Sequence, residues 1–291
     1  MELLMLRIVS MVAIAFIFLL FDIFNNRNVP NLFAYGSVAY GALLTLLYLN
    51  AQLILTSALL AAVVLALGFL VYKAGHLGSA DVMEFAAISL MLPFQQSALL
   101  LRLPQFGLPF VLAVFIAAGL SALVMAPLYY TMMSKNRVRG LVGSVSASDA
   151  VKAATIAAAY VMFILFLYYY IHAYPLGIAV VAIIGAGSCA VVLLSRSIET
   201  AMVGMAPAAA LEPGDIIALE MMKPREIEWF RRRLSRFGRL VTPALIAQMR
   251  ALRVRKRLPV YEHAMPFAVP IFVAVVLSLL AGNIMLFIVH V

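Results

Sequence analysis

Long runs without a charged residue dominate the chain. Three such runs lie between Arg27 and Lys73, between Arg102 and Lys135, and between Lys152 and Arg196. A helix that crosses a bilayer needs about 20 predominantly apolar residues, so the first and third runs can each hold two crossings. The runs lack the alternation of a transmembrane barrel, and lipid accepts only helices or closed barrels. The pattern therefore predicts an all-α fold, a polytopic transmembrane helical bundle.

About eight membrane spans are expected, and counts from six to nine are compatible with the same pattern. The expected spans are 3–21, 32–49, 53–72, 82–101, 106–129, 152–171, 176–194 and 266–289. They divide the chain into a catalytic membrane core with five spans (1–133), a loop with two spans (134–195), a basic segment with short amphipathic helices (196–263) and a last span (264–291).

Composition agrees with a membrane protein and narrows its chemistry. Hydrophobic residues make up 66% of the chain and charged residues 11%, whereas soluble domains have roughly half and a quarter. Cys189 is the single cysteine, which excludes a disulfide framework and a cysteine zinc site. The four histidines are scattered, so we expect no metal and no cofactor. The net charge of +9 comes mostly from basic loops, so we expect no nucleic-acid partner.

Basic residues gather in alternate loops, and this sets the expected orientation. They are Arg27, Lys73, Lys135, Arg137, Arg139, Lys152 and those from Arg196 to Arg257. Because positive loops mark the cytoplasmic side, we expect a multi-pass plasma-membrane protein with these loops in the cytoplasm. Eight spans then place both termini outside.

The segment 196–263 contains a turn signal and two short amphipathic helices. Pro213-Gly214-Asp215 is the turn signal. The first helix carries Ile227, Phe230, Leu234 and Phe237 on one face among arginines, and the second begins with Thr242 as the N-cap and Pro243 at its first position. Such helices usually lie on an anionic leaflet. Lipid contact is therefore the first expectation, and docking of a substrate or partner is the second.

Acidic residues are rare in the apolar half of the chain. From Leu3 to Ser148 the acids are Asp22, Asp81 and Glu84. Asp22 closes the first expected span and Asp81 opens the fourth, so both belong at the cytoplasmic face. Ionisable groups beside a span are candidates for function, because they are costly there.

Two carboxyl groups brought together do not ionise equally, so one can activate water while the other polarises a peptide carbonyl. Gly75 and Gly78 would allow a substrate backbone to approach closely. Each aspartate alone is equally explained as an interface residue: Asp22 as a partner of Arg27, and Asp81 as a favourable charge at its own helix start. Glu84 follows Asp81 by one turn and would accept a basic substrate group or pair with Lys73. From the residues alone, a protease and an ion-coupled transporter are about equally supported.

The sequences around the two aspartates resemble a known family. Residues 22–31, Asp-Ile-Phe-Asn-Asn-Arg-Asn-Val-Pro-Asn, resemble the Asp-x4-Arg-x-[Ile/Val]-Pro-Asn block of type IV prepilin peptidases. Residues 78–81, Gly-Ser-Ala-Asp, resemble the Gly-x-Gly-Asp block of the GxGD intramembrane aspartic proteases, with Ala80 in the position of the second glycine. This alanine also occurs in the archaeal preflagellin-peptidase branch. The chain therefore resembles the archaeal type IV prepilin and preflagellin peptidases.

The resemblance implies a membrane aspartic endopeptidase with Asp22 and Asp81 as the catalytic pair. It would cleave the class III signal peptide of type IV pilin-like or archaellin precursors at the cytoplasmic face, with these precursors and the lipid bilayer as partners. The supporting or substrate-binding residues would be Arg27, Pro30, Gly78, Ser79, Ala80 and Glu84. A single cysteine and no evident Gly-rich methyl-donor site predict cleavage without N-methylation.

Two departures from the family and three other functions remain open. Val82-Met83-Glu84 stand where bacterial members often carry a lysine shortly after the second aspartate, and eight spans exceed the six that are usual for preflagellin peptidases. The alternatives are a protease similar to presenilin and signal peptide peptidase, a proton- or cation-coupled transporter that uses the two aspartates, and a non-catalytic membrane anchor that binds partners through residues 196–263.

Overall fold

The chain is mostly helical, at 78% of its residues, in a computed structural model. The structure describes residues 2–25, 28–74, 77–94, 109–133, 146–172, 175–234, 237–254, 256–261 and 265–282. The apolar helices are α1 (Glu2–Phe24), α2 (Asn31–Leu46), α3 (Ala51–Lys73), α4 (Ser79–Met91), α5 (Phe110–Met133), α7 (Ala147–Phe166), α8 (Pro175–Met202) and α11 (Ala268–Ala281). A short π-helical turn, Leu167–Ile171, continues α7.

Five of the described helices are long and apolar enough to cross a membrane: α1, α3, α5, α7 with its π-helical continuation, and α8. The other three, α2, α4 and α11, have 16, 13 and 14 residues. At 1.5 Å per residue they measure about 20 to 24 Å, which is less than the hydrocarbon core of about 30 Å. The expected total of eight crossings is therefore not confirmed. The five long helices are compatible with a multi-pass membrane protein.

The fourth expected span, 82–101, is wrong in its extent. Helix α4 begins earlier, at Ser79, and ends at Met91. Pro93 follows one residue after the C-cap Leu92, and proline cannot continue a helix without losing a hydrogen bond. The rest of this expected span, from residue 95 on, lies outside the described residues.

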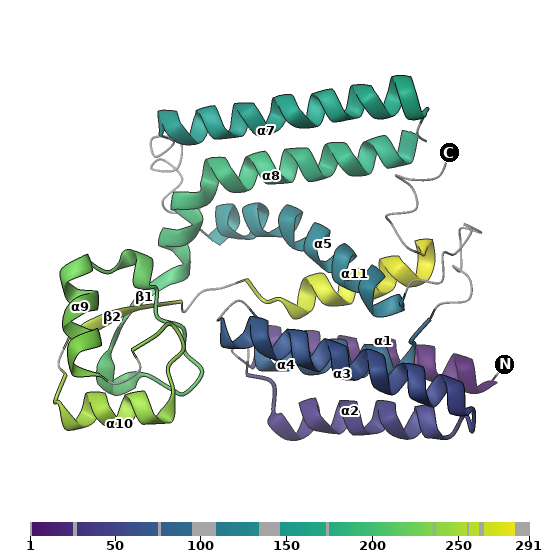
Figure 1. The fold of residues 1–291 in the computed structure, drawn as a ribbon, viewed down its shortest axis with the longest axis horizontal. Helices are drawn as coiled ribbons and strands as arrows, with labels where there is room; N and C mark the ends of the chain where they lie inside the picture. Colours follow the sequence, from purple (N-terminus) through teal and green to yellow (C-terminus); the bar gives the residue numbers. More distant parts are fainter. Residues whose placement is uncertain are drawn as a thin grey trace.

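Helix α4 is the centre of the bundle. Nearly every residue from Val82 to Leu92 is buried. The surrounding core includes Met11 of α1, Val114 of α5 and Ile271 of α11. Figure 1 shows α1 to α4 as one group of near-parallel helices, with α5 and α11 beside it and the α7–α8 pair on the far side. A helix enclosed by protein on all sides is apolar because its side chains are kept from water, as are those of a helix in lipid.

A buried arginine closes the end of α4 that lies away from Asp81. Arg7 of α1 is 2% exposed and donates a hydrogen bond of 2.8 Å to the carbonyl oxygen of Leu90. The hydroxyl of Thr45 on α2 donates to the same oxygen at 2.6 Å. The last carbonyl groups of a helix lack partners within the helix, so these two side chains satisfy one of them and tie α1 and α2 to α4.

Between α8 and α11 the chain forms a separate folded unit, residues 203–261. Its elements are β1 (Val203–Pro207), two short 3-10 turns (Ala208–Ala210 and Leu219–Met221), α9 (Pro224–Arg233), α10 (Pro243–Ala251) and β2 (Arg257–Tyr261). The strands pair antiparallel, with Val203 opposite Tyr261 and Pro207 opposite Arg257. In Figure 1 this unit lies at the left ends of the long helices, where α8 enters it.

Two local predictions for this unit are confirmed. The side chain of Thr242 accepts a hydrogen bond of 3.2 Å from the backbone N–H of Leu245, so it is the N-cap of α10, and Pro243 occupies the first helical position. Gly214 has a φ of +106° in the expected turn. Such a backbone angle is readily available only to glycine.

The apolar faces of α9 and α10 do not face lipid. Phe230 and Leu234 are 0% and 2% exposed, and Leu245 is 2% exposed. They pack with Leu258 and Val260 of β2 in a core of their own. Because these side chains are already buried within the unit, the first expectation for segment 196–263, that its helices lie on the leaflet through these faces, is not supported.

Glu220 predicts a pH dependence for the stability of this unit. Burial alone would raise the pKa of Glu220, but hydrogen bonds from Tyr261 and Arg239 outweigh burial and lower it below its ordinary value of 4.5. A carboxyl group with a depressed pKa stabilises the fold above its unfolded pKa, and this contribution disappears as the pH falls through the folded pKa. We expect Glu220→Gln to flatten the loss of stability on acidification below pH 4.5.

Denaturant unfolding followed through the emission of Trp229, the one tryptophan of the chain, measures this effect. Glu228→Gln is the matched control, because Glu228 is 70% exposed and its ion pair with Arg232 spans 3.9 Å. Equal acid slopes for the wild type and Glu220→Gln would contradict the assignment.

Candidate active site

Asp22 lies in the last turn of α1 and is joined to the start of α11. Its side chain is buried, with 9% exposed, and its Oδ2 accepts a hydrogen bond of 3.0 Å from the backbone N–H of Ala268. Ala268 is the first residue of α11, and the N-cap Phe267 makes no side-chain hydrogen bond. The first N–H groups of a helix need an outside acceptor and attract negative charge. Asp22, on α1, supplies the acceptor and the negative charge to the start of α11. The start of α11 in turn fixes the position of this carboxyl group.

Asp81 is the third residue of α4 and is partly exposed. Its Oδ2 accepts a hydrogen bond of 3.0 Å from the backbone N–H of Gly78, which precedes the helix. A Cβ atom at position 78 would lie 3.0 Å from this oxygen. Glycine therefore lets the backbone approach the carboxyl group closely, and the carboxyl group is held at the helix start.

The two motif blocks meet in space. Val29, from the first block, is buried in one hydrophobic cluster with Phe18, Ala34 and Ala268, and Ala80, from the second block, packs against the same cluster. The carboxyl groups of Asp22 and Asp81 are close enough to interact electrostatically. The end of α1 and the starts of α2, α4 and α11 thus form one site.

Glu84 brings a third carboxyl group to this site. It lies one turn after Asp81 on α4 and is completely buried. Among the described residues neither of its carboxyl oxygens has a hydrogen-bond partner, and the side chain interacts electrostatically with Asp81 and Asp22. The expected pairing with Lys73 is wrong within the described part of the chain, because no ion pair joins the two and the Lys73 ammonium lies 4.7 Å from the centre of the Phe69 ring.

The remaining predicted residues lie around the outer edge of the site or outside the described part. Ser79 is exposed at the first position of α4, and Pro30 is exposed directly before α2. Arg27 and Gly75 lie outside the described residues, so the expected pairing of Asp22 with Arg27 is not described.

Sequence reasoning missed the contribution of α11. The partner of Asp22 is a backbone N–H, and a backbone donor has no residue type that would reveal it. The hydroxyl of Tyr130 on α5 accepts a hydrogen bond of 2.7 Å from the N–H of Met265, which holds the segment that leads into α11. The available signal was Pro266, which marks the chain just before a helix start.

Fold and site together define a helical protein that has five described helices long and apolar enough to cross a membrane, with three neighbouring carboxyl groups at one end of its helices. Within the described part of the chain, no cluster of three His, Cys, Asp or Glu residues has the geometry of a metal site. No family model matches the chain, and neither a curated protein nor a solved structure matches it. The function is therefore argued from the site itself.

Proposed function

We propose that this chain is a plasma-membrane aspartic endopeptidase that cleaves the class III signal peptide of type IV pilin-like or archaellin precursors at the cytoplasmic face. It leaves the new N-terminus unmethylated. One observation carries the proposal: the blocks around Asp22 and Asp81 are separated by two helices in sequence, yet Val29 and Ala80 pack in one cluster between α1 and α4. If the two aspartates only ended helices at the membrane interface, the two blocks would not need to lie side by side in the fold.

In the proposed reaction, the two aspartates share one proton and activate one water molecule. The ionised carboxylate takes a proton from water while the water oxygen bonds to the scissile carbonyl carbon. The protonated carboxyl group donates a hydrogen bond to the carbonyl oxygen. The leaving nitrogen takes up a proton as the C–N bond breaks. The hydrogen bonds from Ala268 to Asp22 and from Gly78 to Asp81 would orient the two groups for these steps.

Exposure at the site supports entry of the leader from the aqueous side. Gly78, Ser79 and Pro30 are exposed, whereas Glu84 lies deeper in the bundle. The leader would pass over the exposed glycine in an extended conformation, and the apolar helix of the precursor would stay in the bilayer. The cut would fall just ahead of that helix, after glycine, as the family resemblance implies.

The positions of the two aspartates favour a peptidase over a transporter. Asp22 lies two residues before the end of α1, and Asp81 two residues after the start of α4. Coupling ions in transporters are usually bound near the middle of the bilayer, where helices are interrupted. Helix α1 is continuous over 23 residues, so Asp22 belongs to a helix end.

The direct test is the cleavage of a precursor. Membranes that contain the wild-type chain are mixed with a pilin or archaellin precursor, and membranes without it are the control. Mass spectrometry should find one cut ahead of the apolar helix and a product with a free N-terminal amine. If no class III precursor is cut, the proposal fails. A cut within the apolar helix would instead support the presenilin-like alternative.

Glu84 is buried below the exposed part of the site and has no described hydrogen-bond partner, so we expect a long basic side chain of the leader to reach inward and pair with it. Changing one leader lysine to glutamine should lower kcat/KM of the wild type about tenfold, the effect of one lost charge-assisted hydrogen bond. Glu84→Gln keeps the side-chain volume, so it should process both precursors at the same reduced rate. The four kcat/KM values form a double-mutant cycle. If Glu84→Gln still prefers the lysine precursor tenfold, Glu84 does not bind the leader.

A further inference from the structure

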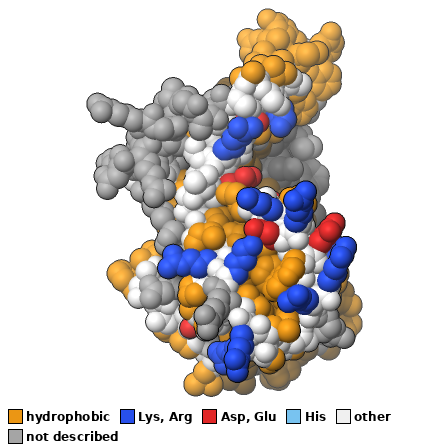
Figure 2. All heavy atoms as spheres, turned by 90° about the vertical axis from the view of Figure 1, so that its left-hand side faces the viewer, with side chains coloured by type: hydrophobic (Ala, Val, Ile, Leu, Met, Phe, Trp, Pro, Cys, Tyr) orange, Lys and Arg blue, Asp and Glu red, His pale blue; other side chains and the backbone are white. Residues whose placement is uncertain are grey.

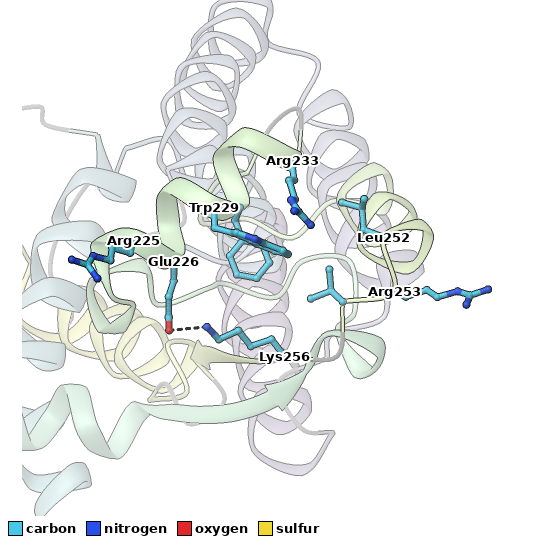
Figure 3. Close-up of a pocket in the computed structure, with 9 residues that line it drawn as sticks. Arg225, Glu226, Trp229, Arg233, Leu252, Arg253 and Lys256 are labelled. Carbon is cyan, nitrogen blue, oxygen red and sulfur yellow. Dashed lines mark ion pairs between the residues drawn. The ribbon is translucent and has the colours of Figure 1, made fainter.

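The folded unit 203–261 has a pocket of about 480 Å³ between α9 and the segment that leads from α10 to β2. Its exposed apolar side chains are Trp229 and Leu252, which are 41% and 45% exposed. Its basic side chains are Arg225, Arg233, Arg253 and Lys256. Figure 3 shows Trp229 and Arg233 on α9 facing Leu252 across the pocket. The pocket thus pairs an apolar surface with several cations.

This pocket faces away from the membrane helices. In Figure 1, α9 and the chain between α10 and β2 lie at the left edge, beyond the ends of the long helices. Figure 2 looks onto this side and shows Lys and Arg side chains around an exposed hydrophobic surface. A bilayer spanned by the helices would lie behind this face. A lipid surface is therefore poorly placed to reach this pocket, whereas a soluble ligand can reach it from the aqueous side.

The cations of the pocket differ in their pairing. Lys256 and Glu226 form an ion pair of 2.7 Å, and this contact lowers the pKa of Glu226. The guanidinium of Arg233 lies 4.6 Å from the centre of the Trp229 ring. Among the described residues, neither Arg225 nor Arg253 takes part in an ion pair. Figure 3 shows the side chains of Arg225 and Arg253 extending outward on opposite sides of the pocket, so they are available to a ligand at its rim. The stacked pair of Arg233 and Trp229 is available at the pocket itself.

We infer that this pocket docks an acidic segment of a partner protein, which places one apolar side chain beside Trp229 and Leu252. Arginine binds carboxylates through two parallel hydrogen bonds, and Trp and Arg are the residues that most often dominate protein interfaces. A nucleic-acid strand fits less well, because it needs cations in a row along several phosphates. Here they surround a single pocket that contains the carboxylate of Glu226.

Trp229 also provides the readout, because the chain has one tryptophan. The full-length protein in detergent micelles is titrated with a short peptide of glutamate and glycine that carries one leucine. We expect a saturable change of the tryptophan emission. The same peptide with serine for leucine, or with lysine for glutamate, should bind at least about tenfold more weakly. A short oligouridylate and phosphatidylglycerol vesicles probe the other two classes of ligand.

Two variants and a matched control locate the binding. Arg225→Ala and Arg253→Ala should each weaken binding about tenfold, because each removes one charge-assisted contact. Arg232→Ala removes the same charge from α9 outside the pocket, where the side chain is 82% exposed, and should leave the affinity unchanged.

The inference is overturned if the acidic peptide does not bind, if Arg232→Ala weakens binding as much as Arg225→Ala, or if the oligouridylate or the vesicles bind as tightly as the peptide. None of these measurements uses a precursor. Failure of the docking site and failure of the proposed peptidase activity are therefore separate results.

Discussion

Replacing Asp22 or Asp81 by asparagine is expected to slow precursor cleavage about a thousandfold or more, because catalytic groups that act as one unit fail together. Asparagine has nearly the shape of aspartate but can neither take a proton from water nor share one with its partner. Each single variant should therefore lose nearly all activity, and the double variant should be little worse than either one.

The structural contacts of both aspartates allow chemistry to be separated from folding. Asp22 accepts an N–H from Ala268, and Asp81 accepts an N–H from Gly78. The amide oxygen of asparagine can accept the same hydrogen bonds, so Asp22→Asn and Asp81→Asn should keep the helix starts satisfied. Alanine cannot, and loss of such a cap costs about 1 kcal/mol. Asp22→Ala should thus lose both activity and thermal stability, whereas Asp22→Asn should lose activity alone.

The control for charge is Glu199→Gln, an exposed acid near the end of α8. It should cleave at the wild-type rate. Initial rates with one precursor, together with helix content and Trp229 emission for every variant, complete the comparison. Undiminished processing by either asparagine variant would exclude the proposed pair.

Sequence patterns located the first three helices well but could not decide how many helices cross the membrane. Helices α1, α2 and α3 begin and end within a few residues of the expected spans. Helix α4 differs because it is buried by neighbouring helices rather than by lipid, and an apolar sequence is the same in both surroundings. The periodicity of α4 therefore carried no information on whether it reaches across the bilayer.

The sheet of the folded unit could not be expected from local sequence. Strand β1 ends at Pro207 and β2 begins at Arg257, so their pairing joins segments about fifty residues apart, and each strand has five residues. Local signals were reliable where the physics is local, as for Thr242 at the start of α10. The arginines around Phe230 suggested a helix on the membrane surface because the residues that cover Phe230 are distant in sequence. These residues include Leu258 and Val260 of β2.

At the candidate site, the rarity of acids pointed to the residues, and the structure supplies their surroundings. Asp22, Asp81 and Glu84 were selected because an ionisable group is costly beside a membrane span. Neither the closure of the site by α11 nor the lack of a described partner for Glu84 follows from residue type. Both depend on how helices distant in sequence pack, and that packing offers a second test of the site.

Helix α3 approaches the second motif so closely that one methyl group should disturb it. A Cβ atom at Gly68 would lie 2.5 Å from Cγ1 of Val82, the residue that follows Asp81. Carbon atoms prefer separations of about 3.5 to 4.0 Å, so Gly68→Ala must shift the start of α4 by about 1 Å or force Val82 out of its place. A misplacement of this size can cost about a hundredfold in rate. We expect cleavage to fall by that factor.

A second substitution should reverse the effect. Val82→Ala removes the two methyl groups that lie 2.5 and 3.1 Å from the new Cβ and leaves only the Cβ of residue 82, at 3.3 Å. The double variant Gly68→Ala/Val82→Ala should therefore recover to within about tenfold of the wild-type rate. Gly36→Ala on α2 is the matched control, since a Cβ atom there meets no other atom within 4 Å, and it should leave cleavage unchanged.

Rescue distinguishes a specific displacement of Asp81 from a general loss of folding. Helix propensity predicts that alanine stabilises both glycine positions by about 0.5 to 1 kcal/mol relative to glycine, so only the contact with Val82 separates position 68 from position 36. If Gly68→Ala retains full activity, or if Val82→Ala fails to restore it while the protein stays folded, the start of α4 does not set the rate.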